Sequence, residues 1–304
     1  MKRFITLFAA ALTAVLPLLA KEPDPALAGT ETKEYRLSGF DGLSVSSIYQ
    51  VELTKSSRYY VKVEAPDFLM SYLLVEVGGG TLKLGVEELP RDIRRKMESG
   101  RYKIRATVTL PELNSLRMSG AARLDANGDF VSRKKFRMDL SGASAAEGLV
   151  VKASEANIEA SGAAHFSLTG EYDRMNLRMS GSAKGNVTGP SGEAWAELSG
   201  AAGLSVNGKL GKVDVQGSGA ANLNLKGSVD DLKIEGSGAA KFDISDAPSR
   251  TAHVRMSGAA GARIDVRDEL SVSLSGAASL RYRAGDRLHI ASQTVSRGAS
   301  LSAY

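Results

Sequence analysis

The stretch Val213-Asp-Val-Gln-Gly-Ser-Gly-Ala-Ala-Asn-Leu-Asn-Leu225 decides the fold, and a near copy, Leu232-Lys-Ile-Glu-Gly-Ser-Gly-Ala-Ala-Lys-Phe-Asp-Ile244, follows it. Apolar and polar residues alternate on both sides of the central Ser-Gly-Ala-Ala, which is the period of a β-strand. Neither copy has the period of a helix. Each copy therefore predicts two short strands that are joined by a tight corner.

The Ser-Gly pair recurs along most of the chain at intervals of 18 to 22 residues. The nine copies begin at Ser119, Ser141, Ser161, Ser180, Ser199, Ser218, Ser237, Ser257 and Ser275. Each of the next two positions is Ala in eight of the nine copies, with Ser182 and Ser144 as the exceptions. A degenerate tenth copy stands at Ser296-Arg-Gly-Ala299.

The repeat length and the invariant corner favour one architecture. A propeller blade needs about 40 residues, and a meander of hairpins does not require the same small residues in every copy. In a parallel β-helix, equivalent residues of successive coils stack about 4.8 Å apart. A corner of fixed shape then needs Gly for its backbone freedom and Ala for its small volume. The sequence predicts an all-β fold, a single-stranded right-handed parallel β-helix of about nine 18–22-residue coils with an N-terminal β-rich cap.

The alternation also predicts which side chains point into the coils. We expect an inner aliphatic column that includes Leu116, Met118, Leu124, Phe166, Leu177, Met179, Leu204, Leu223, Phe242, Val254, Met256, Val272, Leu274 and Leu280. Asp214, Gln216, Asn222 and Asn224 are expected to point outward. The corner serine hydroxyls are expected to bond along the stack or to local backbone.

Residues 31–113 lack the repeat but are rich in alternating segments. Gly78-Gly-Gly80 separates two short apolar stretches and predicts a hairpin. Residues 67–71, after Pro66, predict one turn of helix. Because an open coil end invites edge pairing, we expect this region to cap the first coil. The expected layout is a signal peptide at 1–20, a linker at 21–30, the cap at 31–113 and the β-helix at 114–304, with the last two forming one continuous domain.

The N-terminus has the pattern of a secretory signal peptide. Lys2 and Arg3 precede an apolar segment, and small residues offer cleavage sites after Ala20 or Ala28. An uncleaved membrane anchor is the alternative. The chain has no Cys and therefore no disulfide framework. We expect an exported protein, periplasmic, on the cell surface or secreted, with no stable membrane span after signal cleavage.

The charge does not require a nucleic-acid partner. The formal net charge is +5, and two of the positive charges lie in the predicted signal peptide. Basic residues concentrate at 91–96 and 133–135, which we interpret as solvated loops. A weaker alternative is that they attract an anionic glycan or lipopolysaccharide.

An ordered series of segments resembles a known family. The segments are Gly39–Leu43, Tyr49–Leu53, Val61–Glu64, Gly80–Leu84, Val108–Leu113 and Leu116–Ala121. In this order they resemble the putative auto-transporter adhesin, head GIN domain family, which is common in Bacteroidetes. The resemblance covers nearly the whole mature chain. It implies a signal peptide, a β-helical domain and an extracytoplasmic location, and it offers no catalytic residues to carry over.

Enzyme chemistry is the alternative function, because β-helices also host polysaccharide lyases and hydrolases. Glu197, Asp214 and Glu235 occupy similar coil positions and are candidates for an outward carboxylate column of the kind that glycoside hydrolysis needs. Arg178 and Lys233 nearby favour a solvated strand face instead. We therefore predict no catalytic, cofactor-binding or metal residues and no cofactor.

Histidine positions give no support for a metal site. His165, His253 and His289 are far apart in the sequence, and each is interpreted as a surface or corner residue.

One aromatic residue is a candidate ligand contact. Trp195 falls on the outward side of its strand, at the same coil position as Asp214, where it could stack on a sugar ring. Cover by a neighbouring corner, such as Gly189-Pro190, is the alternative. The sequence as a whole favours a non-catalytic envelope binding module that contacts glycan or a surface protein, with a periplasmic scaffold as a further alternative. Neither the ligand nor the oligomeric state follows from it.

Overall fold

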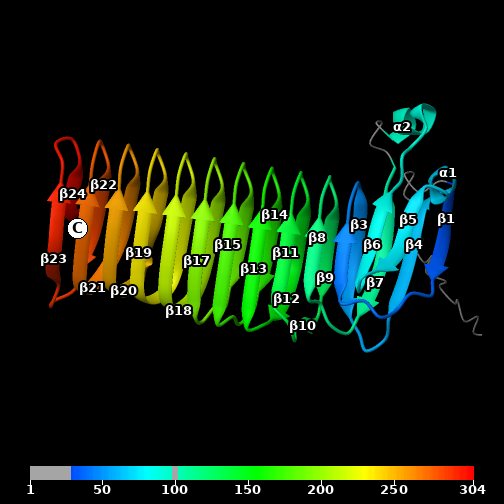
Figure 1. The fold of residues 1–304 in the computed structure, drawn as a ribbon, viewed down its shortest axis with the longest axis horizontal. Coiled ribbons are helices and arrows are strands. Elements are labelled where there is room, and N and C mark those ends of the chain that lie inside the picture. The colour runs from blue at the N-terminus through cyan, green and yellow to red at the C-terminus, as the bar shows by residue number, and fades with distance from the viewer. Residues whose placement is uncertain (1–28, 98–101) are drawn as a thin grey trace, which may run out of the picture.

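The computed structural model describes residues 29–97 and 102–304. These residues form a long rod of stacked β coils, with the first strands at one end and the last strands at the other (Figure 1). The rod is the predicted right-handed parallel β-helix. The predicted signal peptide at 1–20 and most of the predicted linker lie outside the described residues.

Two parallel sheets run the length of the rod, and we call their outward surfaces face A and face B. Face A is formed by β2 (Gly42–Val45), β8 (Ser115–Met118), β11 (Phe136–Leu140), β13 (Glu155–Ala160), β15 (Arg174–Met179), β17 (Glu193–Leu198), the C-terminal halves of β18 (Gly203–Gly217), β19 (Asn222–Gly236), β20 (Lys241–Met256) and β21 (Gly261–Leu274), and β23 (His289–Val295). Face B is formed by β3 (Tyr49–Lys55), β9 (Arg123–Asn127), β12 (Ala145–Lys152), β14 (His165–Thr169), β16 (Lys184–Thr188), the N-terminal halves of β18 to β21, β22 (Ser279–Ala284) and β24 (Ser300–Ala303). The short strand β10 (Asp129–Val131) pairs with the end of β12.

Antiparallel strands close the N-terminal end of the rod. β1 (Thr30–Tyr35) pairs with β4 (Tyr60–Pro66), and β4 pairs with β7 (Ile104–Leu110). β5 (Leu73–Gly78) and β6 (Thr81–Val86) form the predicted hairpin, and α1 (Asp67–Met70) is the predicted helical turn. Within the same region, β2 and β3 already stack in parallel beneath β8 and β9.

The basic run at 91–96 was expected to be a loop, and that expectation is wrong. It forms α2 (Arg91–Met97), which projects from the capped end (Figure 1). Asp92 in the first turn and three basic residues in the last turn both complement the helix dipole. The side chain of Ile93 is buried and holds the helix against the cap. The alternation pattern misses this helix because it is too short to show a period.

Every side chain that we expected inside the coils is buried, at 5% exposure or less. The two alanines of each corner differ in exposure, however: in the copy Ala220-Ala221, the first is exposed and the second is buried. At the second position, Ser144 places a hydroxyl in the interior without a hydrogen-bond partner. The inner alanine therefore keeps the corner from overfilling the core, whereas the outer alanine faces solvent.

The corners are held by their backbone. The nine Ser-Gly glycines have φ between 66° and 71°, a left-handed conformation that favours glycine. The residue after each glycine donates its N–H to the carbonyl of the corner one coil earlier, at 2.7 to 2.8 Å. The serine hydroxyls contribute little to the stacking of the corners. Among the described corner serines, only Ser141 and Ser199 donate a hydrogen bond to a carbonyl on the previous coil, at 3.4 and 3.5 Å.

The corner series begins before the first Ser-Gly pair. Ser47 has φ of 68°, and its carbonyl accepts the N–H of Ala121 at 2.8 Å. Ser47 thus takes the glycine position of the earliest corner. At the other end, the degenerate copy also forms a corner, where Gly298 stacks on Gly276.

We predict that Gly219→Ala destabilises the rod. The added Cβ would lie 2.8 Å from the carbonyl oxygen of Gly200, at a φ of 68°. The left-handed backbone alone costs a residue with a Cβ about 1–2 kcal/mol, so the free energy of unfolding in guanidinium should fall by about 2 kcal/mol or more once the contact is added. Gly211→Ala is the control, because its nearest contact would be 3.9 Å away at an ordinary φ. Equal losses at the two positions would contradict the role of the corner.

Candidate binding surfaces

Face A carries charged residues that neutralise one another. Two residues before each corner serine, the outward column runs Arg117, Asp139, Glu159, Arg178, Glu197, Gln216, Glu235, Arg255 and Ser273. Opposite charges on neighbouring coils form ion pairs, for example Arg117 with Asp139 at 3.2 Å and Arg178 with Glu197 at 3.6 Å. Such exposed pairs contribute little stability, but they leave face A with few uncompensated charges.

The carboxylate column proposed from the sequence is not formed. Glu197 and Glu235 lie in one outward column, separated by Gln216, whereas Asp214 lies in the neighbouring column between Trp195 and Lys233. Lys233 bridges Asp214 at 3.2 Å and Glu235 at 3.1 Å. Hydrogen bonds to Glu235 and Asp214 raise the pKa of Lys233. Two of the three candidate carboxylates are thus held by one lysine.

Trp195 lies where the sequence placed it, outward on β17 and level with Asp214. Its ring is half-buried, and the guanidinium of Arg178 lies 4.8 Å from the ring centroid. This is the geometry of a cation–π contact. Arg178 therefore occupies a ring face on which a sugar would have to stack.

We predict that Arg178→Ala uncovers Trp195. As Trp195 is the only tryptophan in the chain, its emission reports directly on this contact. The variant should shift the emission to longer wavelength, increase quenching by iodide, and lower the free energy of unfolding by about 0.5–1 kcal/mol, the value of an exposed cation–π contact. Glu197→Gln removes the ion pair of Arg178 but leaves the stacking, and should leave the emission unchanged. An unshifted emission in Arg178→Ala would refute the contact.

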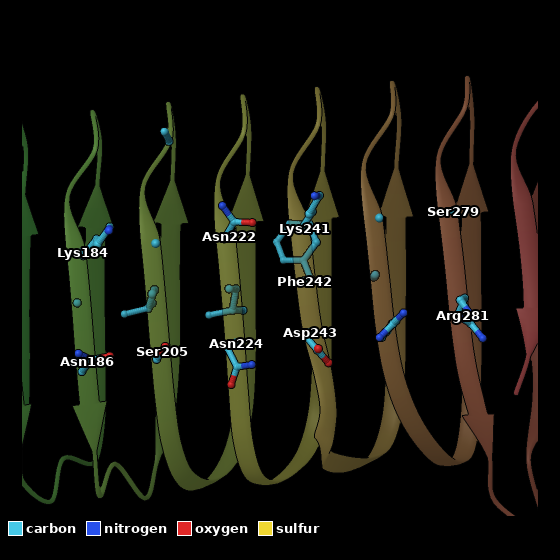
Figure 2. A pocket seen from close by; sticks show the side chains of 18 of the residues that line it. Lys184, Asn186, Ser205, Asn222, Asn224, Lys241, Phe242, Asp243, Ser279 and Arg281 are labelled. Atoms are coloured by element: carbon cyan, nitrogen blue, oxygen red, sulfur yellow. The ribbon is translucent and has the colours of Figure 1, made fainter.

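Face B carries a long groove of about 810 Å³ that crosses the coils from β14 to β22. Figure 2 shows its outward side chains on consecutive strands. One outward column contributes His165, Lys184, Gly203, Asn222, Lys241, Gly261 and Ser279. The other contributes Asn186, Ser205, Asn224, Asp243, Arg263 and Arg281. In the middle of the groove both columns hold glycine or small polar residues, such as Gly203 and Ser205, whose side chains are short.

The cations of this groove differ from those of face A. Lys184, Lys241 and Arg263 form no ion pair with any residue in the described part of the chain. Arg281 contacts the ring of Tyr304, at 5.3 Å from the centroid. The single carboxylate of the groove, Asp243, accepts hydrogen bonds from the hydroxyl and the N–H of Ser245 through Oδ1.

The histidines do not come together. His165 lies on face B, His253 on face A and His289 at the start of β23, and all three are exposed. Among the described residues, no group of three histidine or carboxylate side chains is placed to hold a metal ion. Neither helix in these same residues is long and apolar enough to span a membrane.

The groove was not predicted from the sequence, although the repeat carries a signal for it. Counted from the corner serine, the fourth and sixth positions after it are small or polar in the central copies, as in Gly203 and Ser205 or Asn222 and Asn224. Stacking of these positions on neighbouring coils is what hollows the surface.

The fold and these surfaces define an extended β-solenoid. Residues 39–189 and 184–285 match the family model for the putative auto-transporter adhesin, head GIN domain, and the chain belongs to this family. A search of curated proteins gives no match.

Two solved structures share the fold. One is a putative lipid binding protein from Parabacteroides distasonis ATCC 8503, with a TM-score of 0.52 and 15% identity, covering 91% of this chain and 97% of that chain. The other is a putative adhesin from Parabacteroides merdae ATCC 43184, with a TM-score of 0.50 and 16% identity over the same shares. At this identity the likeness establishes the architecture alone.

Proposed function

We propose that the protein is a non-catalytic binding module of the cell envelope that holds a linear glycan along the face-B groove. The groove itself carries this proposal: it is open along its length and crosses several coils, so it suits a chain-like ligand rather than a compact one. The predicted signal peptide and the family's adhesin description support an exported location.

The lining favours a glycan over a protein partner. Protein interfaces rely on an apolar, often aromatic centre. The large hydrophobic side chains that are exposed in the described residues, Tyr60, Val131, Ile290 and Tyr304, all lie outside the groove. The groove instead offers amide and hydroxyl groups from residues such as Asn186, Ser205, Asn222 and Asn224, which can donate to and accept from sugar hydroxyls.

The carboxylates argue against the enzyme alternative. Glycoside hydrolysis requires two carboxyl groups that flank one bond. The groove holds only Asp243, and its Oδ1 is engaged by Ser245. The candidate carboxylates of face A are paired with Lys233 and Arg178.

We predict that Ser205→Ile/Asn222→Ile abolishes glycan binding. The two outward isoleucines remove hydrogen-bonding groups and fill the middle of the groove, and β-branched residues suit strands, so the rod should fold. The full chain is assayed on an array of linear neutral and acidic oligosaccharides. We expect binding without release of shorter products, and loss of binding in the variant.

Gln216→Ile/Ser273→Ile, outward on face A, is the matched control and should bind as the unchanged protein does. Three results would overturn the proposal: no binding to any linear glycan, binding that only the face-A variant weakens, or turnover of a polysaccharide.

A further inference from the structure

We infer that the groove selects an anionic glycan, a linear chain with carboxylate or sulfate groups, and that Lys241, Arg263 and Arg281 bind those groups. This inference rests on the proposed function and names its ligand class. The three cations lie on β20, β21 and β22, at the C-terminal end of the groove. Their strands are successive neighbours, so the charges fall within about 10 Å along the rod at the usual strand spacing.

The stacking of these cations is unfavourable without a ligand. Arg263 and Arg281 are direct register partners on adjacent parallel strands. Like charges placed opposite one another destabilise a sheet. On face A, by contrast, Arg178 stands in register with Glu197 and forms an ion pair with it. A bound anion between the two arginines would remove the repulsion and form charge-assisted hydrogen bonds.

The charge of the side chains in the outward column that contains Arg263 and Arg281 changes along face B. At the N-terminal end the column holds Glu52, Asp125 and Glu147, all exposed. In the middle it is neutral, with Asn186, Ser205 and Asn224. Asp243 then stands between Asn224 and Arg263, and its Oδ1 accepts a hydrogen bond from Ser245. An anionic chain is therefore repelled from the first coils and attracted to the last ones, which gives the groove a direction.

The uncharged residues of the groove favour an anionic glycan over a single-stranded nucleic acid. Proteins that bind single-stranded nucleic acids stack the bases on exposed aromatic rings. Among Phe, Tyr and Trp, Phe242 alone lines the groove, and this residue is 3% exposed. Asn222, Asn224 and Ser205 offer hydrogen bonds instead, which suit the hydroxyls of sugars between charged groups.

The double variant Lys241→Gln/Arg263→Gln tests whether the groove cations bind an anionic glycan. Neither cation forms an ion pair in the described residues, so the substitutions should not disturb the fold. The probes are an oligogalacturonate, a heparin-derived oligosaccharide, a neutral cello-oligosaccharide and an oligo-dT strand. We expect one or both acidic oligosaccharides to bind best, and to lose affinity at high ionic strength. The variant should lower the affinity for these oligosaccharides about tenfold or more, because it removes hydrogen bonds to charged groups.

The matched control is Lys226→Gln/Arg250→Gln, which removes the same charge from two ion-paired, exposed cations outside the groove. It should leave affinity unchanged, and thermal melts confirm that both variants fold. Equal binding of the neutral oligosaccharide, with no effect of Lys241→Gln/Arg263→Gln, would overturn the anionic ligand. The proposed function would stand in that case if Ser205→Ile/Asn222→Ile still abolished binding. Tighter binding of oligo-dT than of any glycan would overturn the ligand class.

Discussion

The rest of the structure depends on one constraint, the left-handed residue at each corner. At the nine Ser-Gly corners, a Cβ on the glycine would lie 2.6 to 2.9 Å from the carbonyl oxygen of the corner below. That same carbonyl accepts a short hydrogen bond from the next residue of the corner above it. The absence of a side chain is therefore what lets the corners approach closely enough to bond. The result is a continuous backbone spine along one side of the rod, and each coil inherits its register from the coil before it.

Once the spine sets the register, inward side chains pack the core and outward side chains determine the chemistry of the two faces. Inward positions need only be apolar and of suitable volume, and they are buried from Leu116 to Leu280. Outward positions contribute little to stability, so the two faces can carry different chemistry. Face A carries opposite charges that pair with one another, whereas the groove of face B leaves Lys184, Lys241 and Arg263 without an ion-pair partner in the described residues. Cations without ion-pair partners beside polar groups are available to bind an anionic ligand, and this distinguishes the groove of face B from face A, where opposite charges pair.

The corner and the inner column could be predicted from the sequence because both depend on residue type at a fixed distance from Ser-Gly. The outward columns also keep fixed distances from Ser-Gly, and these distances show why the proposed carboxylate column was wrong. Asp214 stands four residues before its corner and Glu197 two before its own, so the two carboxylates never share a column. Ser47 was missed because no glycine marks it. Its corner is the first, so no earlier Ser-Gly corner lies beneath it, and a side chain is tolerated there. The cover of Trp195 by Arg178 arises between coils and has no trace in the local sequence.

Amide hydrogen exchange tests the spine most directly. The corners are exposed to solvent, so their amides would exchange quickly if they were ordinary loops. We predict that the amides that follow the corner glycines, from Ala143 to Ala277, exchange as slowly as those of the buried strands, because each donates to a carbonyl at 2.7 to 2.8 Å. Exchange at these positions at the rate of free loops, with the strands still protected, would contradict it.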